Sequence, residues 1–318
     1  MSVDSNAIER DHPQVSAPLK SIARKGRLVG IKERIIELLL FLAAFSSVAI
    51  TTGIVGVLVY ESSTFFAHVS FVDFFTDTLW TPLFANPRFG ILPLVTGTVV
   101  TTGVALLVAI PIGSIVAIYL SEFAPPLVRE VLKPVLELLS AVPTVVYGYF
   151  ALLFVGPILQ SLVPGLPTFN MLNAGIVMGI MIIPYVSSLS EDALRAVPMS
   201  LRESAYSLGA NKIITALKVV YPAALSGIIA SYILAISRAL GETMIVAIAA
   251  GMQPNLTFDP REPAATITAF IVQVSLGDLP HGSIGYQSIF AAGLVLFVIT
   301  LVFNILGVYF RRRFREVY

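Results

Sequence analysis

The sequence has no cysteine, only three histidines and little charge: 12% of its 318 residues are Asp, Glu, Lys or Arg. Without cysteine, the chain can form no disulfide, no thiolate nucleophile and no cysteine-based metal site. A soluble domain is roughly 25% charged, whereas 56% of this chain is hydrophobic and its mean hydropathy is +0.88. These values predict an integral membrane protein.

The sequence also lacks the motifs of an enzyme or an ATPase. It contains no Gly-x-x-x-x-Gly-Lys-Ser/Thr pattern and no Gly-Lys dipeptide, so it has no phosphate-binding loop of its own for ATP. No Ser/His/Asp set stands out, and the carboxylates are dispersed. We therefore expect no catalytic residue, no cofactor, no metal site and no nucleic-acid partner. Transport against a gradient would be driven by an ion gradient or by a partner protein.

Six apolar segments approach the length that a membrane-crossing helix needs, about 20 residues. They are residues 35–60, 92–120, 131–159, 174–189, 223–250 and 289–310. Lys133 and Glu137 lie near the start of the third segment, and Pro143 predicts a kink in it. The pattern predicts an all-α protein with six transmembrane helices in contact with membrane lipid.

The positions of Lys and Arg predict how the spans are oriented. Seventeen of the 20 fall at both ends of the chain and in the loops around Arg129 and residues 191–222, whereas Arg88 and Arg261 lie on the other side. Cytoplasmic loops carry the excess of positive charge, so both termini are predicted to be cytoplasmic. We divide the chain into a basic N-terminal tail (1–34, expected to be solvated), a transmembrane domain (35–311) and a basic C-terminus (312–318).

The loop 191–222 is a charged island between two hydrophobic spans. Pro198 suits the first position of a helix, Gly209 suits the left-handed residue beyond a helix end, and a second helix is predicted to begin near Asn211. Leu201, Ala205 and Leu208 would give the first helix an apolar stripe. A short, capped amphipathic helix in a loop predicts a docking element.

The fifth span contains two charged residues, Arg238 and Glu242. Their spacing of four places both on one helical face. Two interpretations stay open: an ion pair that only fixes helix packing, or a guanidinium that lines an anion path and is oriented by Glu242. The forked donors of arginine match the oxygens of phosphate or sulfate, which favours an oxyanion.

The segments between spans on the other side, about 61–91 and 251–288, are long. Residues 265–276 predict a helix that is too short to cross a membrane. We consider two roles for it: packing against the outer end of the bundle, or docking of an external partner.

The charged island resembles the EAA loop of ABC importer permeases. The matching residues are Glu203-Ser204-Ala205, Gly209 and Val219-Val220-Tyr221-Pro222, with Ser204, Val219 and Tyr221 departing from the family pattern. In that family the loop is a coupling helix that fits a groove on a cytoplasmic ATPase. The resemblance therefore implies that the ATPase contact is made by Leu201, Glu203, Ser204, Ala205, Leu208 and Gly209.

Two further segments are similar to permeases of the phosphate-specific transport system, the PstC subunit in particular. They are Arg238-Ala-Leu-Gly-Glu242-Thr-Met244 and Ser140-Ala-Val-Pro143-Thr-Val-Val-Tyr147-Gly148. The resemblance implies a type I ABC importer permease bundle in the bacterial plasma (inner) membrane. It also implies a paralogous permease subunit, two cytoplasmic ATP-binding subunits and an extracytoplasmic phosphate-binding protein as partners. Arg238 and Glu242 would then belong to the path of inorganic phosphate.

Other interpretations of the sequence remain open. A permease for sulfate or molybdate would share the coupling loop and differ in the Arg238–Met244 segment. A gradient-driven transporter or channel would need no ATPase, and a membrane anchor or sensor would transport nothing.

Overall fold

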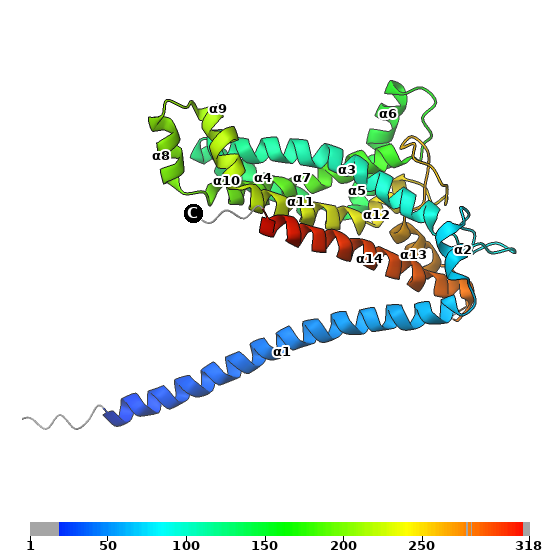
Figure 1. Cartoon of the computed structure of the whole chain (residues 1–318), viewed down its shortest axis with the longest axis horizontal. Helices are drawn as coiled ribbons and strands as arrows, with labels where there is room; N and C mark the ends of the chain where they lie inside the picture. Colours follow the sequence, from blue (N-terminus) through cyan, green and yellow to red (C-terminus); the bar gives the residue numbers. More distant parts are fainter. Residues whose placement is uncertain (1–18, 278, 281, 314–318) are drawn as a thin grey trace, which may run out of the picture. The chain divides into compact units, whose positions relative to one another are not determined.

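In the computed structural model, residues 19–277, 279–280 and 282–313 are described, the first fourteen of them by their backbone alone (Figure 1). The chain divides into two units at Val57. Helix α1 (Leu19–Phe66) contains the junction, and the other described helices belong to the second unit. The described residues form helices and no β-strand, which confirms the all-α prediction.

Helix α1 begins well before the predicted first span. Residues 19–34 of the predicted tail are helical and continue α1, so this part of the tail is not irregular in structure. Lys, Arg, Leu and Ile make up most of this stretch, and Lys, Arg and Leu have high helix propensity. Residues 1–18 of the predicted tail and residues 314–318 of the predicted C-terminus lie outside the described residues.

Within the described residues, five helical segments are long and apolar enough to cross a membrane, and one bent pair of helices forms a sixth if it is counted as a single span. The five are Glu33–Phe66, Leu92–Phe123, Thr144–Leu162, Met171–Arg195 and Ile284–Arg313. They contain helix α3 (Leu92–Ile118) with the π-helical turn η1 (Tyr119–Phe123), then α5 (Thr144–Phe150), η2 (Ala151–Val155), α6 (Gly156–Leu162), α7 (Met171–Arg195) and α14 (Ile284–Arg313).

The predicted third span, 131–159, is wrong at its start. Residues Pro126–Ala141 form a separate helix, α4, and the apolar span begins only at Thr144. Val142 is extended, with a ψ of 130°, because the ring of Pro143 disfavours helical geometry in the residue before it. Pro143 therefore separates two helices here instead of kinking one.

The predicted fifth span, 223–250, is broken twice. Helices α9 (Lys212–Thr215) and α10 (Tyr221–Ala223), joined by η3 (Ala216–Val220), meet α11 (Leu225–Leu240) at a bend of 72°. A second break follows Leu240, and three residues separate it from α12 (Met244–Ala249). Gly241 lies at this break, where its low helix propensity favours termination. Arg238 is therefore in the last turn of a helix and not in the middle of one.

Small residues allow α3 and α7 to pack closely in the centre of the second unit. A Cβ atom on Gly175 would lie 2.6 Å from the Val104 Cβ, and one on Gly179 would lie 2.8 Å from the Ala105 carbonyl oxygen. Such close approach between membrane helices requires small side chains at the contact. This helix pair is the frame to which the loop 191–222 and the broken fifth span are attached.

The second unit has two differently built ends, which we name by their helices (Figure 1). The α8 end carries α8 (Met199–Ser207) and the last turn of the second span. The α2 end carries α2 (Phe71–Thr76) and α13 (Ile267–Ser275). At the α2 end, Phe74, Trp80 and Phe270 are buried, and the rings of Trp80 and Phe270 lie edge to face 5.0 Å apart. The predicted short helix thus packs into the bundle as α13.

Candidate functional site

The charged island folds as a helix, a sharp stop and a second helix, as its sequence predicts. Pro198 precedes α8 as its N-cap, one position earlier than predicted. Gly209 has a φ of +83°, the left-handed conformation that glycine adopts without strain. Asn211 begins α9, where its side-chain oxygen accepts a hydrogen bond from the Ile214 amide at 2.8 Å.

The predicted apolar stripe on α8 does not form a single surface. Ala205 is only 7% exposed and Leu201 packs on a buried apolar cluster, whereas Leu208 is 89% exposed. The helix ends at Ser207, so helical periodicity no longer determines where Leu208 points. The outward surface combines both sides of the turn and contains Met199, Glu203, Ser204, Tyr206, Leu208, Gly209 and Ile213.

A buried carboxylate anchors α4 beside this loop. Glu191 is fully buried and accepts hydrogen bonds from Arg129 Nε and Lys133 Nζ, each at 2.7 Å. Lys133 also donates to Asp192 at 2.6 Å. Burial opposes the charged form of Lys133, but the hydrogen bonds to Asp192 and Glu191 prevail and raise its pKa above the ordinary value. From the sequence, Arg129 and Glu191 are expected to be loop charges and Lys133 lies near the start of the third predicted span, with no sign that the three side chains meet.

Arg202 is a further residue that the sequence did not single out. It directly precedes Glu203, the first residue of the EAA-like segment. The Arg202 guanidinium is buried and pairs with Glu122 of η1, with 2.8 Å between Nη2 and Oε1. In a polar loop, an arginine beside a glutamate indicates a solvated charge. Only the fold shows that one of these neighbours points inward and the other outward.

Arg238 and Glu242 meet at the break between α11 and α12. Arg238 Nη1 lies 3.1 Å from Glu242 Oε2, and the exposed fractions of the two side chains are 36% and 2%. The other carboxylate oxygen, Oε1, accepts hydrogen bonds from the amides of Met244 and Ile245. Glu242 therefore caps α12 with one oxygen and pairs with the guanidinium through the other. A negative charge is favourable at a helix N-terminus, where the helix dipole is positive.

Threonines fix this break against neighbouring helices. Thr268 donates its hydroxyl to the Glu242 carbonyl oxygen at 2.6 Å, and Thr266 lies 3.1 Å from the Thr268 hydroxyl. The Ile267 amide donates to Thr98 of α3 at 3.0 Å. Arg238 and Glu242 do meet, as their spacing of four residues predicts. They meet across the end of α11 and not within one continuous helix, and tertiary hydrogen bonds hold that helix end in place.

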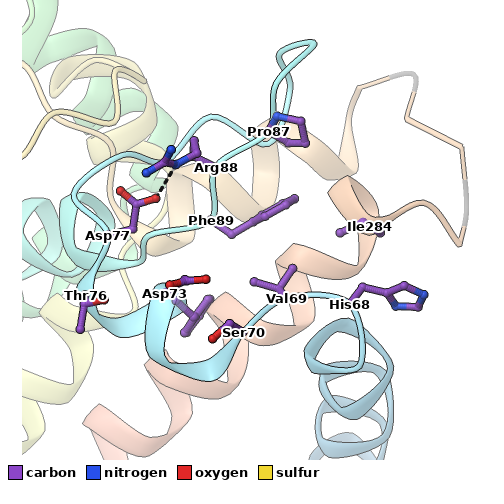
Figure 2. A pocket seen from close by; sticks show the side chains of 11 residues that line it. His68, Val69, Ser70, Asp73, Thr76, Asp77, Pro87, Arg88, Phe89 and Ile284 are labelled. Carbon is purple, nitrogen blue, oxygen red and sulfur yellow. Dashed lines mark hydrogen bonds and ion pairs between the residues drawn. The ribbon is translucent and has the colours of Figure 1, made fainter.

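The α2 end contains a cavity of about 590 Å³, with His68, Asp73, Asp77 and Arg88 among its lining residues (Figure 2). Arg88 Nε donates to Asp77 Oδ2 at 2.7 Å, and this hydrogen bond lowers the pKa of Asp77. The cavity carries charges of both signs. It lies at the opposite end of the second unit from α8.

A protein-family model described as "Binding-protein-dependent transport system inner membrane component" matches residues 109–316, more than half of the chain. The chain belongs to this permease family. The matched region includes the α8 loop and the Arg238–Glu242 pair, so both features lie in the part of the permease that defines the family. The protein is thus a multi-pass inner-membrane component of an ABC transporter and not an enzyme.

Two relatives illustrate the match. The permease is 33% identical over 307 residues to the probable ABC transporter permease protein YqgH of Bacillus subtilis (strain 168), covering 96% of this chain and 98% of that one. It is 34% identical over 252 residues to the phosphate transport system permease protein PstC of Mesorhizobium japonicum, covering 72% and 75% of the two chains.

A solved structure of a bacterial ABC transporter involved in the import of the acidic polysaccharide alginate shares the fold. The match covers 93% of this permease and 99% of that chain, with a TM-score of 0.60 and 18% sequence identity. The predicted ABC importer permease bundle is thereby confirmed.

Proposed function

We propose that the permease forms part of the path for inorganic phosphate in a binding-protein-dependent ABC importer. The observation that carries this proposal is the asymmetric ion pair at the broken helix. Glu242 is buried and fully occupied, while Arg238 is about one-third exposed. Within the described residues, the guanidinium has no ion-pair or hydrogen-bond partner besides Glu242. It therefore keeps free forked donors, which suit the oxygens of a tetrahedral oxyanion.

The identity of the anion rests on the relatives. Several relatives at 30–34% identity are phosphate transport system permeases by name, including those of Mesorhizobium japonicum and Methanocaldococcus jannaschii. Sulfate and molybdate are also tetrahedral oxyanions and remain the second candidates, because a single guanidinium does not select among them.

The first test compares Arg238→Gln with wild type in radiolabelled phosphate uptake. Loss of hydrogen bonds to a charged group costs roughly 1.5–3 kcal/mol each, so we expect uptake to fall about 10- to 100-fold. Arg261→Gln is the matched control, because Arg261 is an exposed arginine that pairs with Asp259 away from the break. An unchanged uptake in Arg238→Gln would leave the pair with only a packing role. Retained sulfate uptake and absent phosphate uptake in wild type would assign the second candidate.

We further propose that the outward surface of the α8 loop docks on a cytoplasmic ATP-binding subunit. Two such subunits and a paralogous permease would complete the importer. The carboxylate of Glu203 is exposed and has no ion pair in the part of the chain that the structure describes. Leu208 provides an apolar contact that projects from the turn. A helix seated in a groove uses this combination of an apolar anchor and a free charge.

The second test is Leu208→Asp, with co-purification of the ATP-binding subunit as the measurement. We expect loss of co-purification while the amount of permease in the membrane stays the same. Leu276→Asp is the matched control, because Leu276 is 83% exposed but follows α13 at the other end. Ala205→Lys is less informative, since Ala205 is buried within the permease itself. Normal co-purification of Leu208→Asp would contradict the docking proposal.

This arrangement puts the α8 end in the cytoplasm and the α2 end toward the phosphate-binding protein. The excess of Lys and Arg near the α8 loop and at the end of α14 supports that orientation. The division into a tail (1–34), a permease domain (35–311) and a C-terminus (312–318) remains part of the same proposal.

A further inference from the structure

Arg202 is a buried charge on α8, a helix most of whose residues are exposed to solvent. Its side chain is 11% exposed, whereas the following residues of α8, Glu203 and Ser204, are exposed. Arginine is almost never buried without a partner. The contacts of Arg202 therefore show what α8 is attached to.

The guanidinium of Arg202 makes four hydrogen bonds. Nη2 and Nε donate to the two carboxylate oxygens of Glu122, at 2.8 and 3.3 Å. Nη1 donates to the Val197 carbonyl oxygen at 2.6 Å, and Nη2 also donates to that of Leu194 at 2.9 Å. One side chain thus joins α8 to the end of the second span and to the end of α7.

The backbone conformation around Glu122 positions its side chain for this contact. It lies in η1, where the helix of the second span widens to a π-helical turn that ends at Phe123. Such turns often mark functional positions in helices. The Glu122 side chain is 6% exposed, and Ser121 donates its hydroxyl to Oε1 at 3.0 Å. The carboxylate therefore has a fixed position at the end of α3.

Arg202 is the α8 side chain whose hydrogen bonds reach residues outside α8. Among the described residues, the other side-chain hydrogen bonds of α8, from Ser204 and Ser207, go to carbonyl oxygens of the same helix. Leu201 adds an apolar contact. Apolar contacts are non-directional, whereas a forked guanidinium–carboxylate pair fixes both distance and orientation.

We propose that Arg202 and Glu122 are positioning residues that make α8 and the second span move as one body. This inference rests on the proposed docking of α8 to an ATP-binding subunit. Movement of that subunit would displace α8. Because the Arg202–Glu122 pair is a rigid connection, α3 would move by the same displacement. The pair thus couples ATP hydrolysis to opening of the anion path while contacting neither ATP nor the anion.

The test uses Arg202→Gln in a reconstituted importer, with phosphate imported per ATP hydrolysed as the measurement. We expect the ATP-binding subunit to remain bound and ATP hydrolysis to continue, while the ratio of phosphate to ATP falls about tenfold, a typical size for coupling between two sites. Arg202→Lys, which keeps the charge but loses the fork, should fall between Arg202→Gln and wild type. Arg195→Gln is the matched control, because Arg195 is an exposed arginine nearby whose only ion pair among the described residues is a long one, 3.9 Å to Glu191.

Glu122→Gln keeps the two carbonyl hydrogen bonds of Arg202 and offers a second measurement if Arg202→Gln does not accumulate. Because the chain has no cysteine, spin labels can be placed uniquely on Ser207→Cys in α8 and Leu107→Cys in α3, both exposed positions. We expect a narrow distribution of the distance between the labels with and without ATP. Glu122→Gln should broaden that distribution.

Two results would overturn the inference. One is a phosphate-to-ATP ratio in Arg202→Gln equal to that of wild type, together with an unchanged label distribution in Glu122→Gln. The other is loss of the ATP-binding subunit from Arg202→Gln, because the pair would then only hold the docking surface together. The variant Leu208→Asp separates these from failure of the docking proposal: if it still binds the ATP-binding subunit, docking itself is wrong and the inference falls with it.

Discussion

The two ends of the second unit are stabilised by different kinds of contact. At the α8 end, buried charges join the helices: Glu191 with Arg129 and Lys133, and Arg202 with Glu122. At the α2 end, buried aromatic rings form the contacts, and the ion pairs Asp77–Arg88 and Asp259–Arg261 have arginines that are 59% and 63% exposed.

This difference in contacts suggests different roles for the two ends: one stabilises the fold and the other transmits movement between helices. Burying an aromatic side chain removes a large apolar area from water and stabilises the fold. A buried ion pair adds little net stability, because desolvation offsets its attraction, but it fixes geometry. We infer that the α2 end supplies more of the stability and that the α8 end supplies directional links. The following predictions test that contrast, from the largest expected effect to the smallest.

Phe74→Ala should have the largest effect on stability. Phe74 is fully buried, and its ring contacts those of Phe65 and Trp80. Removing a buried phenylalanine costs about 3–5 kcal/mol, so the unfolding temperature in detergent should drop strongly. The exposed Phe84 provides the control variant Phe84→Ala. The contrast between the ends fails if Phe74→Ala is as stable as Phe84→Ala, or if its surviving molecules import less phosphate per ATP.

Glu191→Gln should have an intermediate effect on stability. It leaves Arg129 and Lys133 without their shared carboxylate. Removing one partner of a buried pair costs 3–5 kcal/mol, but these two cations are 27% and 22% exposed and can rehydrate, so we expect about 2 kcal/mol. Thermal unfolding measures it, and Glu203→Gln is the control because Glu203 is exposed. A loss larger than that of Phe74→Ala would reverse the contrast.

Asp77→Asn should have the smallest effect, with a defined pH dependence. The hydrogen bond from Arg88 lowers the pKa of Asp77 in the folded state, so the pair stabilises the fold above the unfolded-state pKa of about 3.9. That contribution is lost as pH falls through the lowered pKa. Surface pairs contribute about 0–1 kcal/mol. The difference in unfolding temperature between wild type and Asp77→Asn should be small and constant from about pH 5 to 8, and should disappear at lower pH. A difference that grows on acidification would contradict this sign.

Local chemistry made several features predictable from the sequence. Hydropathy located the spans, because a helix in lipid must be apolar over the thickness of the bilayer. Gly209 and Asn211 marked where one helix of the loop 191–222 ends and the next begins, because each satisfies backbone requirements within a few residues. Arg238 and Glu242 were identified because charges in a membrane helix are rare and usually functional.

Other features depend on contacts between residues distant in sequence. The helix break at Glu242 is fixed by Thr268 and α12, so the spacing of four residues could not show that the pair spans a helix end. The sequence also gave no reason to separate Ala205, which is buried, from Leu208, which is exposed.

The sequence by itself determined that this is a membrane protein with a capped, charged loop between two spans and a charge pair spaced four residues apart, because composition, spacing and cap residues are local properties. Only the tertiary structure decided that Arg202 points inward to Glu122, 80 residues earlier, and that Glu191 joins α4 to α7. Hydropathy gives the same value to a buried charge and to a solvated one, and the partner that permits burial is known only once the chain is folded.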